Sequence, residues 1–212
     1  MHMLLEQISH SGVVAILRGV EPSRLLPLGE ALLAAGVGAI EVTLNSEGAL
    51  EGITALKQHL GARIPVGAGT VMNGELAHAA INAGAQFILT PHLAESTLAV
   101  CRERQVPSVI GCMTPTEAVR AYDLGADMVK IFPAGSLGPT YFRELRGPLP
   151  QIPTMAVGGV SAANAADFIR AGAKAIGAGS QLVDFAAVAR GDWDAVRQKA
   201  AVMVNAVREA RA

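Results

Sequence analysis

The sequence predicts a (β/α)8 TIM barrel, an α/β fold in which eight parallel strands alternate with helices. Three observations indicate this fold. Eight short apolar segments recur along the 212 residues, apolar residues at helical spacing separate them, and four of the segments directly follow a glycine placed to end a helix. Because periodicity alone does not show that a sheet closes, a doubly wound open sheet is the alternative.

Strands two, four, six and eight are expected directly after four glycines of a weak internal repeat. The repeat consists of AAGVGAIEV, NAGAQFILT, DLGADMVKI and RAGAKAIGA, which contain Gly36, Gly84, Gly125 and Gly172. Glycine just past a helix ends it because glycine adopts the left-handed conformation without strain. Each glycine is followed at once by a short apolar run, which is typical of the turn from a helix into a strand.

The other four strands are expected at VVAIL (13–17), IPVGA (64–68), VPSVI (106–110) and IPTMAV (152–157). Apolar residues at helical spacing predict helices between them, for example over 25–35 and 162–170. No linker, charge block or low-complexity tract interrupts the chain. We therefore expect residues 1–212 to form a single domain.

Composition and charge disfavour several classes of protein. The chain has 17 basic and 18 acidic residues and a net charge of −1, so neither a nucleic acid nor an anionic membrane surface is an expected partner. No apolar run suits a membrane span, and the first residues lack the pattern of a signal peptide. The two cysteines, Cys101 and Cys112, are typical of free thiols in the cytoplasm, although two could form one bridge.

Polar residues collect at the carboxyl ends of the expected strands, where barrel enzymes build their sites. They are Arg18, Glu41, Thr43, Asn45, Thr70, Thr90, His92, Thr114 and Lys130. Side chains alternate between the two faces of a strand. This alternation directs Glu41 of the second strand, and Lys130 and Phe132 of the sixth, into the barrel. Glu41 and Lys130 are therefore expected to share its mouth, the end at which the strands finish.

A lysine buried in such a mouth suits imine chemistry. Burial favours the neutral amine, which can attack a ketone and form an iminium that accepts electrons as a carbon–carbon bond breaks. A nearby carboxylate can move the protons that this sequence of steps requires. The residue types alone equally allow a second interpretation, in which Lys130 and Glu41 form a buried structural ion pair.

Glycine-rich turns follow the seventh and eighth strands. VGGVSAAN contains Gly158 and Gly159, with Ser161 as the expected N-cap of the next helix, and GAGSQLV contains Gly179 and Ser180. Such turns expose backbone N–H groups to an anion, and the loops after these two strands form the recurrent phosphate site of barrels. One loop alone would favour a simple tight turn, but two adjacent loops favour a phosphorylated carbonyl compound as substrate.

No metal site is expected, because the five histidines show no metal-ligand spacing. His92 is interpreted as a surface loop residue and Cys112 as a packing residue. The lysines outside the expected site, Lys57, Lys174 and Lys199, fall in helices or loops and are expected to be solvated.

Motifs from end to end give the chain a specific resemblance to the class I aldolases that act on 2-keto-3-deoxy-6-phosphogluconate and its galactonate epimer. These motifs, in the order and spacing of that family, are VAILRG, EVTLNS, GAGTV, TPH, KIFPA, AVGGVSAAN and GAGSQLV. The resemblance implies a barrel that assembles as a homotrimer and uses neither a metal nor an organic cofactor. It also implies reversible cleavage of a phosphorylated 2-keto acid to pyruvate and glyceraldehyde 3-phosphate.

Carried over residue by residue, the resemblance implies that Lys130 is the Schiff-base lysine and Glu41 the general acid and base, acting directly or through water. It implies that Arg18 and Thr70 hold the carboxylate end of the substrate and that Phe132 lines the pyruvate pocket. The implied phosphate site consists of Gly158, Gly159, Gly179 and Ser180.

A departure within the family favours one epimer. Gluconate-type members carry an arginine where this chain has Asn45, and Asn45, Arg18 and the segment LGPTYFREL resemble the 2-dehydro-3-deoxy-6-phosphogalactonate enzymes. The same chemistry on the gluconate epimer or on 4-hydroxy-2-oxoglutarate is the nearest alternative. More distant alternatives are a phosphate-binding barrel isomerase or synthase and a non-catalytic phosphosugar-binding barrel. The presence of both Lys130 and Glu41 disfavours the non-catalytic barrel.

Overall fold

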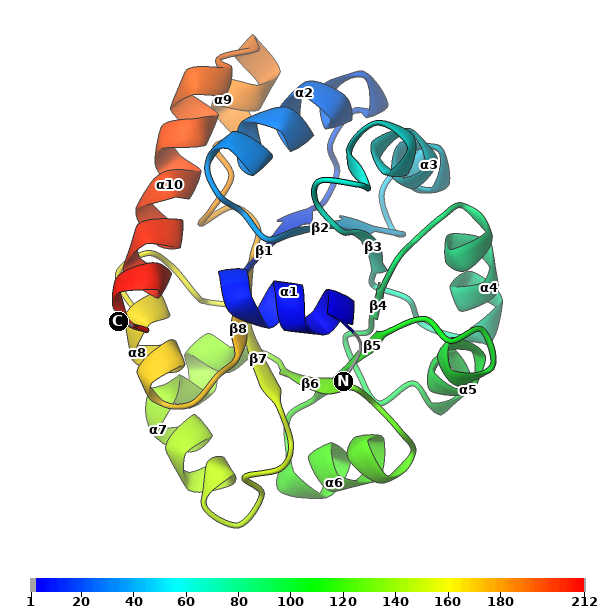
Figure 1. The fold of residues 1–212 in the computed structure, drawn as a ribbon, viewed down its shortest axis with the longest axis vertical. Coiled ribbons are helices and arrows are strands. Elements are labelled where there is room, and N and C mark those ends of the chain that lie inside the picture. Colours follow the sequence, from blue (N-terminus) through cyan, green and yellow to red (C-terminus); the bar gives the residue numbers. More distant parts are fainter. Residues whose placement is uncertain (1–2, 212) are drawn as a thin grey trace.

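Eight parallel strands close into a barrel in the computed structural model, which describes residues 3–211 (Figure 1). The strands pair in chain order, and β8 pairs with β1 to complete the ring. This closure confirms the (β/α)8 barrel and rules out the open sheet. The strands are β1 (Val13–Leu17), β2 (Ala39–Thr43), β3 (Val66–Gly69), β4 (Ile88–Leu89), β5 (Ser108–Cys112), β6 (Met128–Ile131), β7 (Thr154–Val157) and β8 (Ala175–Ala178).

Helices form a ring around the strands, and one further helix, α1, lies across an end of the barrel (Figure 1). None of the helices within residues 3–211 is both long enough and apolar enough to cross a membrane. The helices are α1 (Met3–Ser11), α2 (Pro22–Ala34), α3 (Ala49–Leu60), α4 (Gly74–Asn82), α5 (Glu95–Glu103), α6 (Pro115–Asp123), α7 (Ala134–Arg146), α8 (Ala165–Arg170), α9 (Phe185–Arg190) and α10 (Trp193–Glu209).

Strands β3, β5 and β7 each begin two residues later than expected, and a proline explains the difference. Proline has no backbone N–H to donate to a neighbouring strand. The three strands begin directly after Pro65, Pro107 and Pro153. The carbonyl oxygens of these prolines still accept backbone hydrogen bonds of 2.9–3.0 Å from the preceding strands. Each proline therefore joins the sheet through its acceptor alone.

The four repeat glycines end their helices as expected. Gly36, Gly84, Gly125 and Gly172 have φ values of +84°, +99°, +96° and +106°, in the left-handed region that glycine adopts without strain. After each glycine, the next N–H donates back to a carbonyl five residues earlier, as in the 3.1 Å bond from Val37 to Leu32. This bond completes a Schellman motif, which turns the chain sharply into the following strand.

Side-chain alternation divides the core into two layers. On β2 and β6, Ile40 and Val129 belong to the layer between strands and helices, whereas Ala39 and Met128 belong to the barrel interior. Leu5 and Ile8 of α1 join the interior layer and are fully buried. Because α1 leads through Gly12 directly into the first residue of β1, it closes the end of the barrel opposite the mouth.

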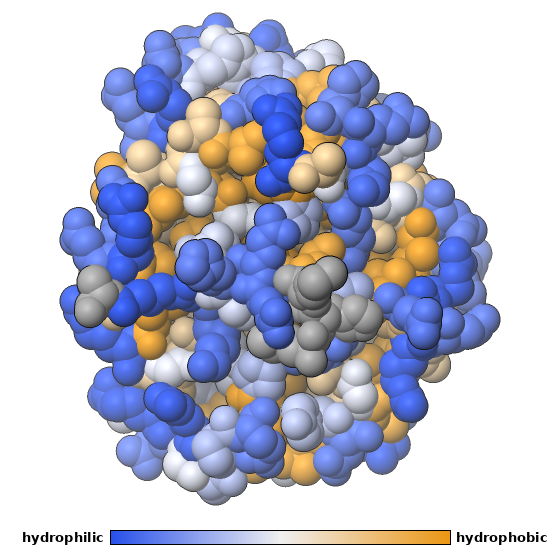
Figure 2. Space-filling view, viewed as in Figure 1, coloured by the Kyte–Doolittle hydropathy of each residue, from blue (hydrophilic) through white to orange (hydrophobic). Residues whose placement is uncertain are grey.

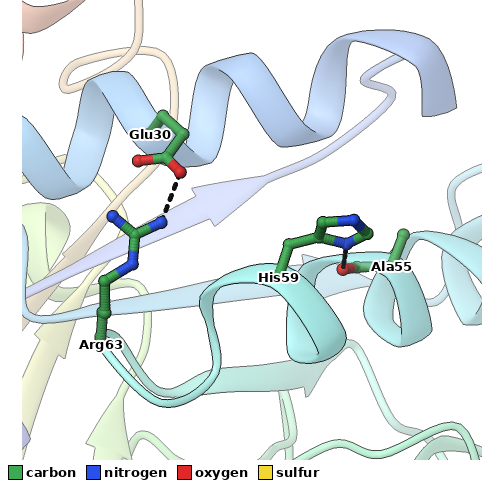
Figure 3. Close-up of polar contacts among 4 residues, drawn as sticks. All are labelled: Glu30, Ala55, His59 and Arg63. Atoms are coloured by element: carbon green, nitrogen blue, oxygen red, sulfur yellow. Dashed lines mark hydrogen bonds and ion pairs between the residues drawn. The ribbon is translucent and has the colours of Figure 1, made fainter.

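The surface around α1 is mostly polar, with apolar patches between the outer helices (Figure 2). One polar contact in the outer ring joins Arg63, in the loop before β3, to Glu30 of α2 (Figure 3). Nearby, Nδ1 of His59 donates to the carbonyl oxygen of Ala55, one turn earlier in α3, at 2.9 Å. Because Arg63 and Glu30 are about half exposed, their ion pair contributes only about 0–1 kcal/mol to stability.

Candidate active site

A cavity of about 370 Å³ opens at the mouth of the barrel and brings together all nine residues expected to form the site. These residues come from six different strands or the loops that follow them, which is the usual construction of a barrel active site. Gln181 and Phe185 also line the cavity, although no pattern in the sequence singled them out. The expected residues are Arg18, Glu41, Thr70, Lys130, Phe132, Gly158, Gly159, Gly179 and Ser180.

Lys130 lies on β6 and points into the barrel, with 5% of its surface exposed. Burial lowers the pKa of its ammonium, the charge of Glu41 opposes this shift, and the charge of Arg18 adds to it. The Nζ atom lies 5.3 Å from the centre of the Phe132 ring. This environment favours the neutral amine, the form that acts as a nucleophile.

Glu41 lies on β2 and is 1% exposed. Burial raises the pKa of its carboxyl group, and the positive charges of Lys130 and Arg18 oppose the shift. Its Oε2 atom is buried and has no hydrogen-bond partner. A carboxyl group with a raised pKa and an unoccupied oxygen is suited to exchanging protons with a bound molecule.

Lys130 and Glu41 do not form an ion pair. Within residues 3–211 the structure contains four ion pairs, all between side chains that are about half exposed or more, and neither residue takes part. A buried structural pair requires close contact to offset the cost of removing both charges from water. The separation therefore disfavours the structural interpretation and leaves Glu41 free to contact a ligand.

Arg18 spans the mouth between two strand ends. Its Nη1 atom donates to Asn45 Oδ1 at 2.9 Å, and its Nη2 atom donates to Thr70 Oγ1 at 3.2 Å. Thr70 has a φ of +56°, an uncommon conformation for a β-branched residue that persists only where its surroundings hold it. The guanidinium is thus fixed at the rim, and its planar array of donors is suited to binding a carboxylate.

The loop after β7 directs two carbonyl groups to partners that do not line the cavity. The carbonyl oxygen of Gly158 accepts from the N–H of Gly135 at 2.7 Å, and that of Gly159 accepts from Asn164 at 3.0 Å. Within residues 3–211, no protein acceptor is found for the N–H groups that border the cavity on these loops, those of Gly159, Val160, Ser180 and Gln181. Free N–H groups on two adjacent loops form a cradle for an anion.

The close approach of the loop after β7 to the start of α7 requires that Gly159 carry no side chain. A Cβ atom on Gly159 would lie 2.9 Å from the Cα atom of Gly135. Gly158 and Gly159 also have φ values of +85° and +71°, which other residues rarely adopt. Both glycines are therefore needed to form the cradle.

Ser161 is not the N-cap of the next helix, so this expectation was wrong. The chain makes a further turn, and α8 begins at Ala165, directly after Asn164. Asn164 causes the delay because its Oδ1 atom accepts from the N–H of Ser161 at 2.8 Å and its amide donates to Gly159. These bonds hold residues 161–164 as a turn behind the cradle.

Three threonines at strand ends have structural roles. Thr43 donates to the carbonyl oxygen of Leu17, and Thr90 donates to that of His92 at 2.6 Å. Thr114 caps α6 through a reciprocal pair of bonds with Glu117.

His92 is exposed and does not line the cavity, which agrees with its interpretation as a loop residue. Cys112 is buried, which raises the pKa of its thiol to about 12.

Within the described chain, no three His, Cys, Asp or Glu side chains gather as a group that could hold a metal ion. His2 lies outside the described residues.

Gly69 has no side chain, and the space beside it is occupied by the carboxylate of Glu41. Gly69→Ala is therefore expected to reduce kcat by roughly a factor of 100. A Cβ atom on Gly69 would lie 1.5 Å from Glu41 Oε1 and would displace the carboxylate. Steady-state kinetics and thermal unfolding check the prediction. Gly147→Ala is the matched control because its new Cβ would come no closer than 3.4 Å to the carbonyl oxygen of Glu144. Equal activity of the two variants would contradict the prediction.

A closed parallel barrel with a lysine and a carboxylate buried at its mouth is typical of aldolases, lyases that break carbon–carbon bonds. Comparison with known proteins shows that this chain is one of them. The family model described as "KDPG and KHG aldolase" matches residues 5–199, and the chain belongs to this family. The resemblance inferred from the sequence motifs is thereby confirmed.

A relative and two solved structures agree with this assignment. The chain is 37% identical over 199 residues to the 2-dehydro-3-deoxy-6-phosphogalactonate aldolase of Escherichia coli K12, covering 93% of this chain and 95% of the relative. A native KDPGal structure matches with a TM-score of 0.88 and 36% identity, covering 94% of this chain and 95% of that one. KDPG aldolase from Legionella pneumophila, with pyruvate captured at low pH as a covalent carbinolamine intermediate, matches with a TM-score of 0.86 and 25% identity, covering 92% and 95%.

Proposed function

We propose that this chain is a class I aldolase that cleaves 2-dehydro-3-deoxy-6-phosphogalactonate reversibly to pyruvate and D-glyceraldehyde 3-phosphate. The observation that carries the proposal is the buried amine of Lys130, which shares a cavity with the unpaired carboxyl group of Glu41. A relative over nearly the whole chain is named for this substrate. The covalent pyruvate adduct in the Legionella relative also supports the proposal.

The reaction begins with attack of the neutral Lys130 amine on the C2 ketone. A carbinolamine forms, and loss of water converts it to a protonated imine. The burial that lowers the pKa of Lys130 increases the fraction of free amine. Arg18 and Thr70 bind the adjacent carboxylate, and this orients C2 toward Nζ.

Glu41 then accepts the proton of the C4 hydroxyl group, directly or through a water molecule. The C3–C4 bond breaks, its electron pair moves into the imine, and glyceraldehyde 3-phosphate leaves as an enamine remains on Lys130. Glu41 returns its proton toward C3 of the enamine, and hydrolysis of the resulting imine releases pyruvate and the amine. The raised pKa of Glu41 suits both directions of this proton transfer.

The phosphate occupies the cradle formed by the loops after β7 and β8. Its oxygens accept hydrogen bonds from the free N–H groups of Gly159, Val160, Ser180 and Gln181. Binding energy from this remote group positions the reacting carbons relative to Lys130 and Glu41. Phe132, which is 39% exposed, forms an apolar wall beside the amine.

Trapping with borohydride tests the proposal. The protein is incubated with pyruvate and sodium borohydride, and its intact mass and peptide map are measured. We expect a single reduced pyruvate adduct on the peptide that contains Lys130. A folded protein that forms no adduct, or forms it on another lysine, would overturn the class I mechanism.

The epimer is tested by comparing kcat/KM for three substrates. We expect the value for the phosphogalactonate substrate to exceed those for 2-dehydro-3-deoxy-6-phosphogluconate and 4-hydroxy-2-oxoglutarate. The second candidate is the same chemistry on the gluconate epimer, which the family description "KDPG and KHG aldolase" favours. A higher value for that epimer would replace the first assignment while leaving the mechanism in place.

Assembly as a homotrimer in the cytoplasm remains part of the proposal. Cys101 and Cys112 are both free and buried, in keeping with a reducing compartment. Light scattering of the purified protein measures the mass of the assembly. A mass other than three chains would contradict the trimer.

A further inference from the structure

Lys199 contacts the back of the phosphate cradle, although the sequence suggested that it is solvated. It lies on α10 and is half-buried. Its Nζ atom donates to the carbonyl oxygen of Ser180 at 2.9 Å and to that of Val183 at 3.3 Å. Both carbonyl groups belong to the loop that joins β8 to α9. Lys199 therefore ties this loop to α10 from the side opposite the cavity.

Two further acceptors of this loop are also paired. The carbonyl oxygen of Gly179 accepts from the N–H groups of Leu182 and Val183 at 2.9 and 2.8 Å. Asp184 Oδ1 accepts from the N–H of Ala187 at 3.0 Å and caps α9. The loop is thus held by its carbonyl groups and its cap, which leaves its early N–H groups for a ligand.

The geometry of one peptide unit links Lys199 to the cavity. In a trans peptide the C=O and N–H groups point in opposite directions. The Ser180 carbonyl points to Lys199, so the N–H of Gln181 in the same peptide unit points away from α10, and Gln181 lines the cavity. A hydrogen bond from an ammonium to this carbonyl polarises the peptide and makes its N–H a stronger donor.

We propose that Lys199 is a positioning residue for the substrate phosphate: it fixes and polarises the Ser180–Gln181 peptide so that its N–H binds a phosphate oxygen. This inference rests on the proposed function, which places the phosphate in the cradle. Lys199 does not touch the substrate in this scheme. It acts through the loop, and its positive charge also lies behind the site of the anion.

Lys199→Met keeps most of the length of the side chain and removes the ammonium, and Lys57→Met is the matched control. Lys57 is also half-buried, but it lies on α3, away from the cavity. We expect Lys199→Met to weaken binding of inorganic phosphate, measured by calorimetry, about tenfold and to raise KM for the phosphorylated substrate similarly, with kcat little changed. Lys199→Arg should restore most of this loss.

The rate of pyruvate trapping by borohydride separates a positioning role from general damage to the fold. Pyruvate carries no phosphate, so Lys199→Met should form the adduct at the wild-type rate. Loss of phosphate binding together with an equal loss of trapping would overturn the inference, as would phosphate binding equal to that of Lys57→Met. Failure of the wild-type protein to form the adduct would instead refute the aldolase mechanism, and the phosphate measurement would still decide the role of Lys199.

Discussion

Lys130→Met is expected to remove turnover, with kcat/KM falling by a factor on the order of 10⁵, and to abolish the pyruvate adduct. Methionine fills nearly the same volume as lysine but has no amine, so the barrel interior stays packed while the nucleophile is lost. Steady-state kinetics and intact-mass spectrometry measure the two losses. Lys174→Met, an exposed lysine directly before β8, is the matched control and should behave as wild type.

The double variant Lys130→Met/Glu41→Gln distinguishes catalysis from structure. If the two residues formed a structural ion pair, each single variant would leave one buried charge without its partner and lose about 3–5 kcal/mol of stability, most of which the double variant would regain. In the proposed mechanism the two groups do not stabilise each other by contact, so the effects of the single variants should nearly add in the double variant, with a coupling of about 1 kcal/mol or less. Denaturant unfolding of the three variants measures this coupling. A coupling of several kcal/mol would support the structural interpretation.

Glu41→Gln is expected to lower kcat by a factor of roughly 10²–10⁴, because the amide can no longer accept the C4 hydroxyl proton. The adduct with pyruvate should still form, since the Lys130 amine is intact. Single-turnover kinetics with the phosphorylated substrate and borohydride trapping separate these steps. Glu103→Gln, at the exposed end of α5, is the control. Full activity in Glu41→Gln would remove Glu41 from the mechanism.

Glu41→Gln is also expected to shift the pH dependence of pyruvate trapping to lower pH. Burial lowers the pKa of the Lys130 amine, and the negative charge of Glu41 opposes this shift by raising the pKa. Removing the charge should lower this pKa further, so a larger fraction of the amine is neutral at a given acidic pH. The pH at which trapping reaches half its maximal rate should therefore move down in Glu41→Gln. Movement to higher pH would show that another charge controls the lysine.

The barrel and its mouth were predictable because both follow from local patterns. The four glycines marked helix ends, and alternation along β2 and β6 sufficed to direct Glu41 and Lys130 inward. Strands β3, β5 and β7 start later than expected because a proline removes a donor, as at Pro65. That residues 1–212 form a single domain stays a prediction.

Contacts between distant segments were not predictable from such patterns. Lys199 and Ser180 are 19 residues apart, and no local pattern distinguishes a helical lysine that binds a loop carbonyl from one that is solvated. Ser161 lost its expected role to Asn164, which competes for the same backbone groups. Gln181, on the loop after β8, and Phe185, at the start of α9, line the cavity through tertiary packing that no local pattern indicates.

The closure of one barrel end by α1 has a consequence for the order in which products depart. Leu5 and Ile8 fill that end, so substrate and products pass through the same mouth. In the proposed mechanism the pyruvate portion stays attached to Lys130 while the phosphorylated aldehyde is free to leave. We expect aldehyde release first and pyruvate release last, with pyruvate acting as a competitive inhibitor against the substrate. A non-competitive pattern for pyruvate would show that the order is reversed.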